Sequence, residues 1–132
     1  MGNFIEELKE KAKDEAYLKK LGIQVLEVKE GYALVEMPLS EELKNIHGLV
    51  HGGAIFSLID AAFELASNSH GVTALALNMN ITFHQAPRIP GYLQAEAKEI
   101  HLSKRLGTYF IQAFDQDGNL IATCQALVYR KG

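Results

Sequence analysis

Two carboxylates interrupt the most apolar stretch of the chain. The segment HGGAIFSLIDAAFELASNSHG, residues 51–71, has the composition of a buried helix, yet it contains Asp60 and Glu64 one turn apart. Burying a carboxylate is costly, so its presence in such a helix indicates a role in chemistry. A carboxylate can take a proton from water as a general base or attack a carbonyl as a nucleophile. We interpret Asp60 as this reactive group; the alternative is a structural carboxylate held by hydrogen bonds at an interface.

A glycine pair, Gly52 and Gly53, opens the same helix. The N-terminus of a helix presents unpaired N–H groups and a partial positive charge, and glycines let a ligand's carbonyl approach the backbone closely. The Gly52 amide, with Gly53, could therefore stabilise an oxyanion. Asp60 lies about 12 Å further along the helix axis at 1.5 Å per residue, too far to act on the same carbonyl. Asp60 of a second subunit, across a two-fold axis, could face these glycines.

Other polar side chains near this segment favour structural roles. His47 and His51 are four residues apart, but they lie in a loop that offers no third ligand, so we expect no metal and expect His51 to brace the loop. Ser57 lacks the G-x-S-x-G turn of a serine nucleophile. Glu64 is interpreted as half of an ion pair or as a residue that raises the pKa of Asp60. Cys124 is interpreted as a small core residue.

The bulk properties exclude several classes of protein. The chain has 132 residues, a net charge of −3 and 48% apolar residues, which is typical of one globular domain and gives no support for nucleic-acid binding. No apolar run is clean enough to span a membrane, and the first twenty residues are too charged for a signal peptide. The single cysteine favours a reducing compartment. We expect a cytoplasmic protein with one domain over residues 1–132.

Hydrophobic periodicity predicts the order of elements. A helix is expected over residues 4–19 and ends at Gly22; a hairpin follows over 23–39, with a short helical turn at Ser40. The long helix runs from Gly52 to about Ser69. Four strands are then predicted, in the segments VTALALNMNITFH, GYLQAEAKEIHL, RLGTYFIQAF and NLIATCQALVYR. The short connections QAPRIP, SK and DQDG predict antiparallel neighbours.

One long apolar helix cannot be covered on all sides by a single sheet. A sheet curled around the helix, with a second subunit closing the open side, solves the burial problem. The fold class is therefore α+β, a hotdog fold with an N-terminal helix, and a homodimer or a tetramer built as a dimer of dimers is expected.

The spacing of the site residues resembles a known family. The pattern Asn45-x5-His51-Gly52-Gly53, continued as x-Ile55-Phe56-x-Leu58-x-Asp60-x-Ala62-Phe63, is similar to the central-helix signature of hotdog acyl-CoA thioesterases of the phenylacetate-degradation (PaaI-like) type. The resemblance extends to DQDGNLIA and covers roughly the last hundred residues.

The resemblance implies an acyl-CoA substrate, no cofactor, and two active sites per dimer. It implies that Gly52 binds the thioester carbonyl, with His51 and Gly53 beside it, and that Asp60 acts as base or nucleophile. Asn45 would orient substrate or water; the alternative is a loop residue that bonds its own backbone.

The sequence departs from the family pattern at two positions. The family usually has a small or neutral residue where Glu64 lies, and a polar residue where Ala76 lies. Asn78 or Thr82 could only partly replace the missing polar contact.

Basic residues gather around the turn after the predicted fourth strand: Lys98, His101, Lys104 and Arg105, with Arg88 in an earlier loop. The resemblance favours coenzyme A phosphates as their ligand, with Arg105 and Gly107 as the best candidates; the alternative is an ordinary solvated turn.

The predicted function is hydrolysis of an aryl- or medium-chain acyl-CoA to the free acid and coenzyme A. One alternative is a hotdog enoyl-CoA hydratase or dehydratase, for which His51 is poorly placed beside Asp60. The other is a non-catalytic acyl-CoA-binding protein, which would not need Asp60.

Overall fold

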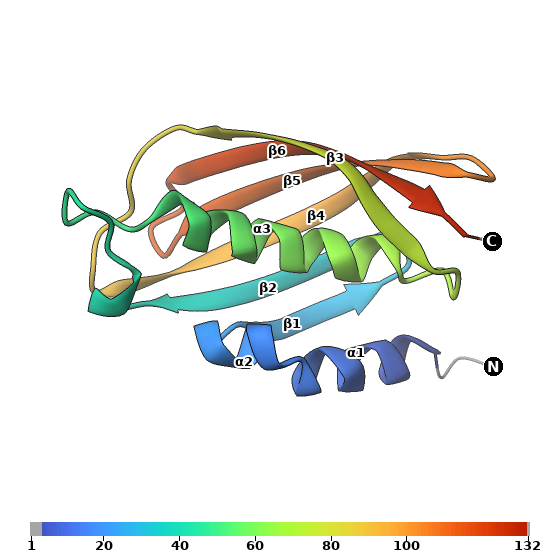
Figure 1. Cartoon of the computed structure of the whole chain (residues 1–132), viewed down its shortest axis with the longest axis horizontal. Helices are drawn as coiled ribbons and strands as arrows, with labels where there is room; N and C mark the ends of the chain where they lie inside the picture. Colours follow the sequence, from blue (N-terminus) through green and yellow to red (C-terminus); the bar gives the residue numbers. More distant parts are fainter. Residues whose placement is uncertain (1–3, 132) are drawn as a thin grey trace.

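A computed structural model describes residues 4–131, which form one curled sheet around a central helix (Figure 1). The helices and strands follow one another along the chain as α1 (Phe4–Asp14), α2 (Ala16–Leu21), β1 (Gln24–Lys29), β2 (Tyr32–Leu39), the 3-10 turn η1 (Glu41–Leu43), α3 (Gly52–Ser67), β3 (Ala74–Phe83), β4 (Gly91–Leu102), β5 (Leu106–Asp115) and β6 (Leu120–Arg130). The predicted α+β hotdog fold is confirmed.

The six strands are all antiparallel to their neighbours, in the order β1-β2-β4-β5-β6-β3. The expectation that short connections join neighbours holds for β4, β5 and β6 but is wrong for β3 and β4. The connection over residues 84–90 crosses the end of the sheet, so β3 pairs with β6 at the far edge. Local spacing could not show this, because six or seven residues suffice to pass over two strands at one end of a curled sheet.

Small side chains on the concave face let α3 lie close to the sheet. Alanines at 33, 95, 97, 113 and 122 are fully buried beneath it. Larger side chains fill the space beside this row, where the ring of Phe63 from α3 meets Tyr109 from β5 edge to face with centroids 5.6 Å apart. Eleven of the sixteen residues of α3 are buried, which explains why the helix is apolar nearly all round.

The N-terminal helix expected over residues 4–19 is two helices that meet at Glu15. Gly22 ends the second helix, as predicted, in a left-handed conformation with φ 74°, which glycine adopts without strain. The Tyr17 hydroxyl joins α2 to α3 through a hydrogen bond of 2.7 Å to Ser57 Oγ. The N-terminal helices therefore lie against β1 and reach the first turns of α3 (Figure 1).

The β3 strand is the open edge of the sheet and exposes apolar side chains. Leu75, Leu77 and Phe83 are 52%, 58% and 48% exposed, although strand edges are commonly protected by charge or by a covering element. None of the helices described over residues 4–131 is long and apolar enough to cross a membrane.

Candidate active site

His51 fixes where α3 begins. Its backbone N–H donates to the Leu43 carbonyl at 2.7 Å, and its ring Nδ1 accepts a hydrogen bond from the Gly53 N–H at 2.8 Å. His51 is thus the N-cap of α3, where a side-chain acceptor satisfies one of the free N–H groups. The prediction that His51 braces the loop is confirmed.

The same hydrogen bond sets the tautomer of the His51 ring. Because Nδ1 accepts from Gly53, the neutral ring carries its proton on Nε2. The side chain is exposed, so this N–H is accessible beside the start of the helix. A ligand oxygen there can accept a hydrogen bond from it.

The Gly52 amide is the free donor at this helix terminus. The Gly53 amide is occupied by His51, whereas the Gly52 amide has no acceptor among residues 4–131. A Cβ at position 52 would lie 3.3 Å from the ring of Phe83, so the glycine lets this ring pack close to the start of the helix. Of the two amides expected to bind a carbonyl, only that of Gly52 is available within the chain.

Asp60 lies half-buried on α3, two turns beyond the free amide. Burial raises the pKa of its carboxyl, and the negative charge of Glu15 raises this pKa further. No cation and no hydrogen bond within residues 4–131 opposes these effects. A carboxylate left without such support is a stronger base than an ordinary aspartate.

Among residues 4–131, Glu64 does not form the expected ion pair. The group that acts on it most strongly is another carboxylate, Glu15. Burial and then the charge of Glu15 raise the pKa of Glu64 to about 7, with a smaller effect from Asp60. The ion-pair interpretation is wrong for residues 4–131, because no basic side chain there contacts Glu64. The alternative, that Glu64 raises the pKa of Asp60, stays a prediction: the pKa of Asp60 is raised by burial and Glu15, while the charge of Asp60 raises that of Glu64.

Asn45 holds the loop that leads to α3. Its side-chain Oδ1 accepts hydrogen bonds from the backbone N–H groups of His47 at 2.8 Å and Leu49 at 3.1 Å. This is the loop-bonding role that was weighed against substrate contact. The side-chain NH₂ has no protein acceptor among residues 4–131, so a role in orienting substrate or water stays a prediction.

Asn78 and Thr82 are not brought together with Asp60 in one chain. They pair across the ladder with Leu127 and Thr123, whose side chains point to the convex face, because alternate residues of a strand face opposite sides. α3 lies on the concave face. Contact of Asn78 or Thr82 with substrate therefore stays a prediction. It would have to occur on the convex face of the sheet, whereas Asp60 lies on α3, on the concave face.

Arg105 and Gly107 lie at the β4–β5 turn, at the end of the sheet where α3 terminates (Figure 1). The Arg105 guanidinium donates to the Tyr129 hydroxyl at 2.9 Å and is exposed. Gly107 is buried, and a Cβ there would lie 3.1 Å from both Tyr109 and Val128. Close packing gives a structural reason for this glycine, and coenzyme A contact stays a prediction for both residues.

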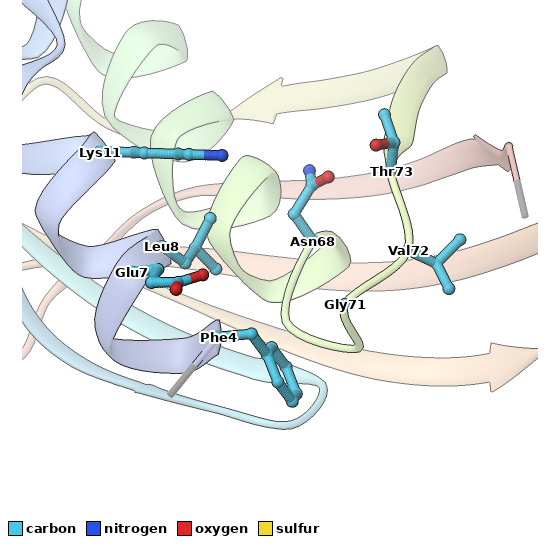
Figure 2. A pocket seen from close by; sticks show the side chains of 8 residues that line it. All are labelled: Phe4, Glu7, Leu8, Lys11, Asn68, Gly71, Val72 and Thr73. Atoms are coloured by element: carbon cyan, nitrogen blue, oxygen red, sulfur yellow. The ribbon is translucent and has the colours of Figure 1, made fainter. Parts of the chain in front are cut away.

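Two cavities lie at opposite ends of α3. One of about 250 Å³ is lined by Tyr17, His51, Gly53 and Ser57, among others, and therefore lies at the N-terminal end of the helix. The other, of about 220 Å³, lies between α1 and the α3–β3 turn and contains none of the predicted site residues (Figure 2). The cavity at the N-terminal end of α3 is therefore the one that belongs to the candidate site.

Glu15 and Tyr17 are site residues that the sequence did not reveal. The Tyr17 hydroxyl is hydrogen-bonded to Ser57, forty positions later, and the charge of Glu15 raises the pKa of Glu64. No spacing within the N-terminal segment indicates either contact, because both arise from how α2 docks on α3. The only local signal for Glu15 is its spacing from buried residues. It lies three residues after Ala12 and three before Leu18, so it falls on the buried side of the amphipathic segment.

Comparisons with known proteins agree with this geometry. The model of the Thioesterase superfamily matches residues 47–122. A putative esterase of Archaeoglobus fulgidus is 44% identical over 118 residues, which cover 89% of this chain and 77% of the relative. The acyl-coenzyme A thioesterase PaaI of Escherichia coli is 34% identical over 119 residues, which cover 90% of this chain and 85% of that protein. The solved structure of the Escherichia coli PaaI protein from the phenylacetic acid degradation operon superposes with a TM-score of 0.88 at 33% identity, and covers 95% of this chain and 96% of that one.

The sheet curled around one helix is the hotdog fold, and the family match together with the PaaI relative defines the class as hotdog thioesterases. The chain belongs to the thioesterase superfamily, and within it to the PaaI-like group. It is a hydrolase acting on thioester bonds.

Proposed function

We propose that the substrate is an acyl-CoA and that the products are the free acid and coenzyme A. The observation that carries the proposal is the pairing, on one helix, of the free Gly52 amide with the unsupported carboxylate of Asp60. The acyl-coenzyme A thioesterase activity named for the Escherichia coli relative supports the choice of substrate.

In the proposed reaction the thioester oxygen lies at the start of α3. The Gly52 amide and the Nε2–H of His51 donate to it, and both donors strengthen as negative charge develops on the oxygen. Asp60 takes a proton from the water that attacks the carbonyl carbon, or itself attacks this carbon and displaces the coenzyme A thiolate to form an anhydride that water then cleaves. In both routes the C–S bond breaks and the thiolate takes up a proton. Either route releases the thiol of coenzyme A.

The proposed site is composite. Because Gly52 and Asp60 are eight residues apart on one helix, about 12 Å along its axis, the Asp60 that serves a given amide comes from a second subunit. The open β3 edge with exposed Leu75 and Leu77 supports pairing of two copies there. We propose a dimer with two sites, assembled further into a tetramer.

Other features of the substrate follow from the same assembly. A partner that packs against the β3 edge brings its own β4–β5 turn toward the N-terminus of α3 in the first subunit. Arg105 of that turn is therefore a candidate to bind a coenzyme A phosphate. The apolar surroundings of α3 suit an aryl or medium-chain acyl group. We propose a cytoplasmic location, with Cys124 as a buried free thiol.

A panel of acyl-CoA substrates with detection of free thiol tests the proposal. We expect thiol release from at least one aryl- or medium-chain acyl-CoA. Binding of acyl-CoA without thiol release would favour a non-catalytic binding protein. Hydration of an enoyl-CoA with the thioester intact would favour a hydratase.

A further inference from the structure

We propose that the cavity at the N-terminal end of α3 is the subsite for the acyl group of the substrate, and that Tyr17 of α2 determines which acyl groups it accepts. The inference rests on the proposed function, because it names the part of the substrate that this end of the site binds. It assigns a specificity role to the N-terminal segment, which lies outside the residues 47–122 matched by the family model.

Three elements form the walls of this cavity. α2 contributes Tyr17 and Leu21, η1 contributes Leu43, and the start of α3 contributes His51 and Gly53. His51 is also a proposed donor to the thioester oxygen, so a group bound in the cavity lies beside the carbonyl that reacts. The acyl chain and the sulfur of coenzyme A are the two groups attached to that carbonyl carbon, and they are the candidates for the cavity.

The size of the cavity favours the acyl chain over coenzyme A. Its volume is about 250 Å³, and an apolar cavity of about 150 Å³ is large enough to bind benzene. The cavity therefore has room for one aryl ring or a short alkyl chain. The pantetheine arm of coenzyme A with its nucleotide is much longer and has to leave the site toward solvent.

The lining of the cavity suits an uncharged acyl group. Its apolar side chains are those of Leu21, Leu43 and Ala54. Lys44 also lines the cavity, but its ammonium group lies 2.7 Å from the carboxylate of Glu41. Glu42, in the same wall, adds a negative charge. An acyl group that ends in a carboxylate therefore finds no unpaired Lys or Arg in the part of this lining formed by residues 4–131.

Two consecutive hydrogen bonds hold Tyr17 in the wall of the cavity. Its hydroxyl lies 2.7 Å from Ser57 Oγ, and Ser57 Oγ donates to the Gly53 carbonyl at 2.9 Å. A hydroxyl group has one proton to donate, so the Tyr17 hydroxyl is the donor to Ser57. Ser57 is 8% exposed and Tyr17 is 57% exposed. The anchor is therefore buried, and the Tyr17 ring forms the outer wall that limits the length of a bound acyl chain.

The first test compares kcat/KM for dodecanoyl-CoA with kcat/KM for hexanoyl-CoA. Tyr17→Ala removes the outer wall, so the ratio of the two values should rise at least about fivefold, because one methylene group in a fitted apolar pocket changes kcat/KM by about 10-fold or more. Tyr17→Phe keeps the ring and should keep the ratio of wild type. A smaller rise in Tyr17→Ala, or an equal rise in Tyr17→Phe, overturns the proposal.

The matched control is Lys20→Ala, because Lys20 is an exposed residue of the same helix. Its ratio should equal that of wild type, and a rise like that of Tyr17→Ala would overturn a specific role of Tyr17. Succinyl-CoA, whose acyl group ends in a carboxylate, should be a poorer substrate of wild type than hexanoyl-CoA. The reverse order overturns the assignment of an uncharged acyl group.

The second test does not depend on activity. Calorimetry measures the binding of two unreactive thioethers, S-hexyl-CoA and S-dodecyl-CoA, and Tyr17→Ala should bind the longer one better relative to the shorter one than wild type does. If no acyl-CoA is hydrolysed, the proposed function fails and this comparison alone decides the role of Tyr17. The same relative affinity in wild type and Tyr17→Ala overturns the proposal. Tyr17→Leu, which keeps an apolar side chain without the ring, replaces Tyr17→Ala in both tests if the alanine variant does not fold.

Discussion

In the proposed site the ring of His51 has two tasks: Nδ1 caps the helix, and the Nε2–H donates to the ligand. The two tasks can be separated by substitution. His51→Ala removes the cap and should lower the free energy of unfolding by about 1 kcal/mol, the usual effect of losing an N-cap. His51→Asn supplies another good capping side chain and should retain most of that stability, while both variants lose the Nε2–H donor and turnover.

Urea unfolding and thiol-release rates of the two variants check this prediction. The contrast between alanine and asparagine is the informative quantity, since it isolates the cap from the donor. Equal loss of stability in both would show that the Gly53 hydrogen bond contributes little. Full activity in His51→Asn would remove the ring from the site.

At the scale of single residues, the sequence predicted identity better than orientation. Gly52, His51 and Asp60 were identified because their types and spacing match a helix N-terminus and a buried charge. Which of the two glycine amides stays free could not be predicted, because it depends on which N–H donates to the His51 ring. Asn78 and Thr82 were predicted near the site without knowledge of their face of the sheet, which only the register with β6 supplies.

At the scale of elements, the burial of Glu64 on α3, and secondly the charge of Glu15 from the N-terminal segment, make stability depend on pH. The pKa of Glu64 rises from an ordinary 4.5 to about 7 on folding. Between these values the folded chain binds more protons than the unfolded chain, so the free energy of unfolding falls as pH rises from about 4.5 to about 7. The Glu64→Gln variant lacks the titrating group and therefore this fall in the free energy of unfolding. Its melting temperature should exceed that of wild type by a larger margin at pH 8 than at pH 5.

Thermal unfolding of wild type and Glu64→Gln at several pH values tests that sign. Acid effects shared by both proteins cancel in the difference between them. A difference in melting temperature that stays constant from pH 5 to pH 8 would show that Glu64 titrates normally in the folded chain.

Element types were predictable throughout because periodicity is a local property. The long helix, the hairpin and the four later strands all form as expected. The break at Glu15 and the position of β3 were not predictable, since each depends on contacts with distant residues. The same limit hid Glu15 and Tyr17 from sequence reasoning.

At the scale of the whole molecule, the proposed site needs residues from two chains. The β3 edge exposes a row of apolar side chains and unpaired backbone groups, and a second copy would satisfy both. Leu77→Lys places a charge on this edge at a side chain that is 58% exposed in the single chain. We expect it to shift the protein toward monomer and to lower turnover in parallel, with little change in secondary structure.

Sedimentation velocity and circular dichroism of wild type and Leu77→Lys check this expectation, with Leu26→Lys on β1 as a control at the opposite edge, where the side chain is 44% exposed. A wild-type protein that is monomeric at micromolar concentration would contradict the composite site. An active Leu77→Lys monomer would do the same.

The most direct measurement of the central claim is turnover of Asp60→Asn together with its melting temperature. Asn keeps the shape of the side chain but can neither accept a proton from water nor attack a carbonyl, so kcat should fall by about 100-fold or more. Because burial raises the pKa of Asp60, ionisation disfavours the folded state and the melting temperature should stay equal or rise. Glu64→Gln, one turn away, should lose less turnover. A fully active Asp60→Asn enzyme, or one that loses activity only by unfolding, would contradict the account.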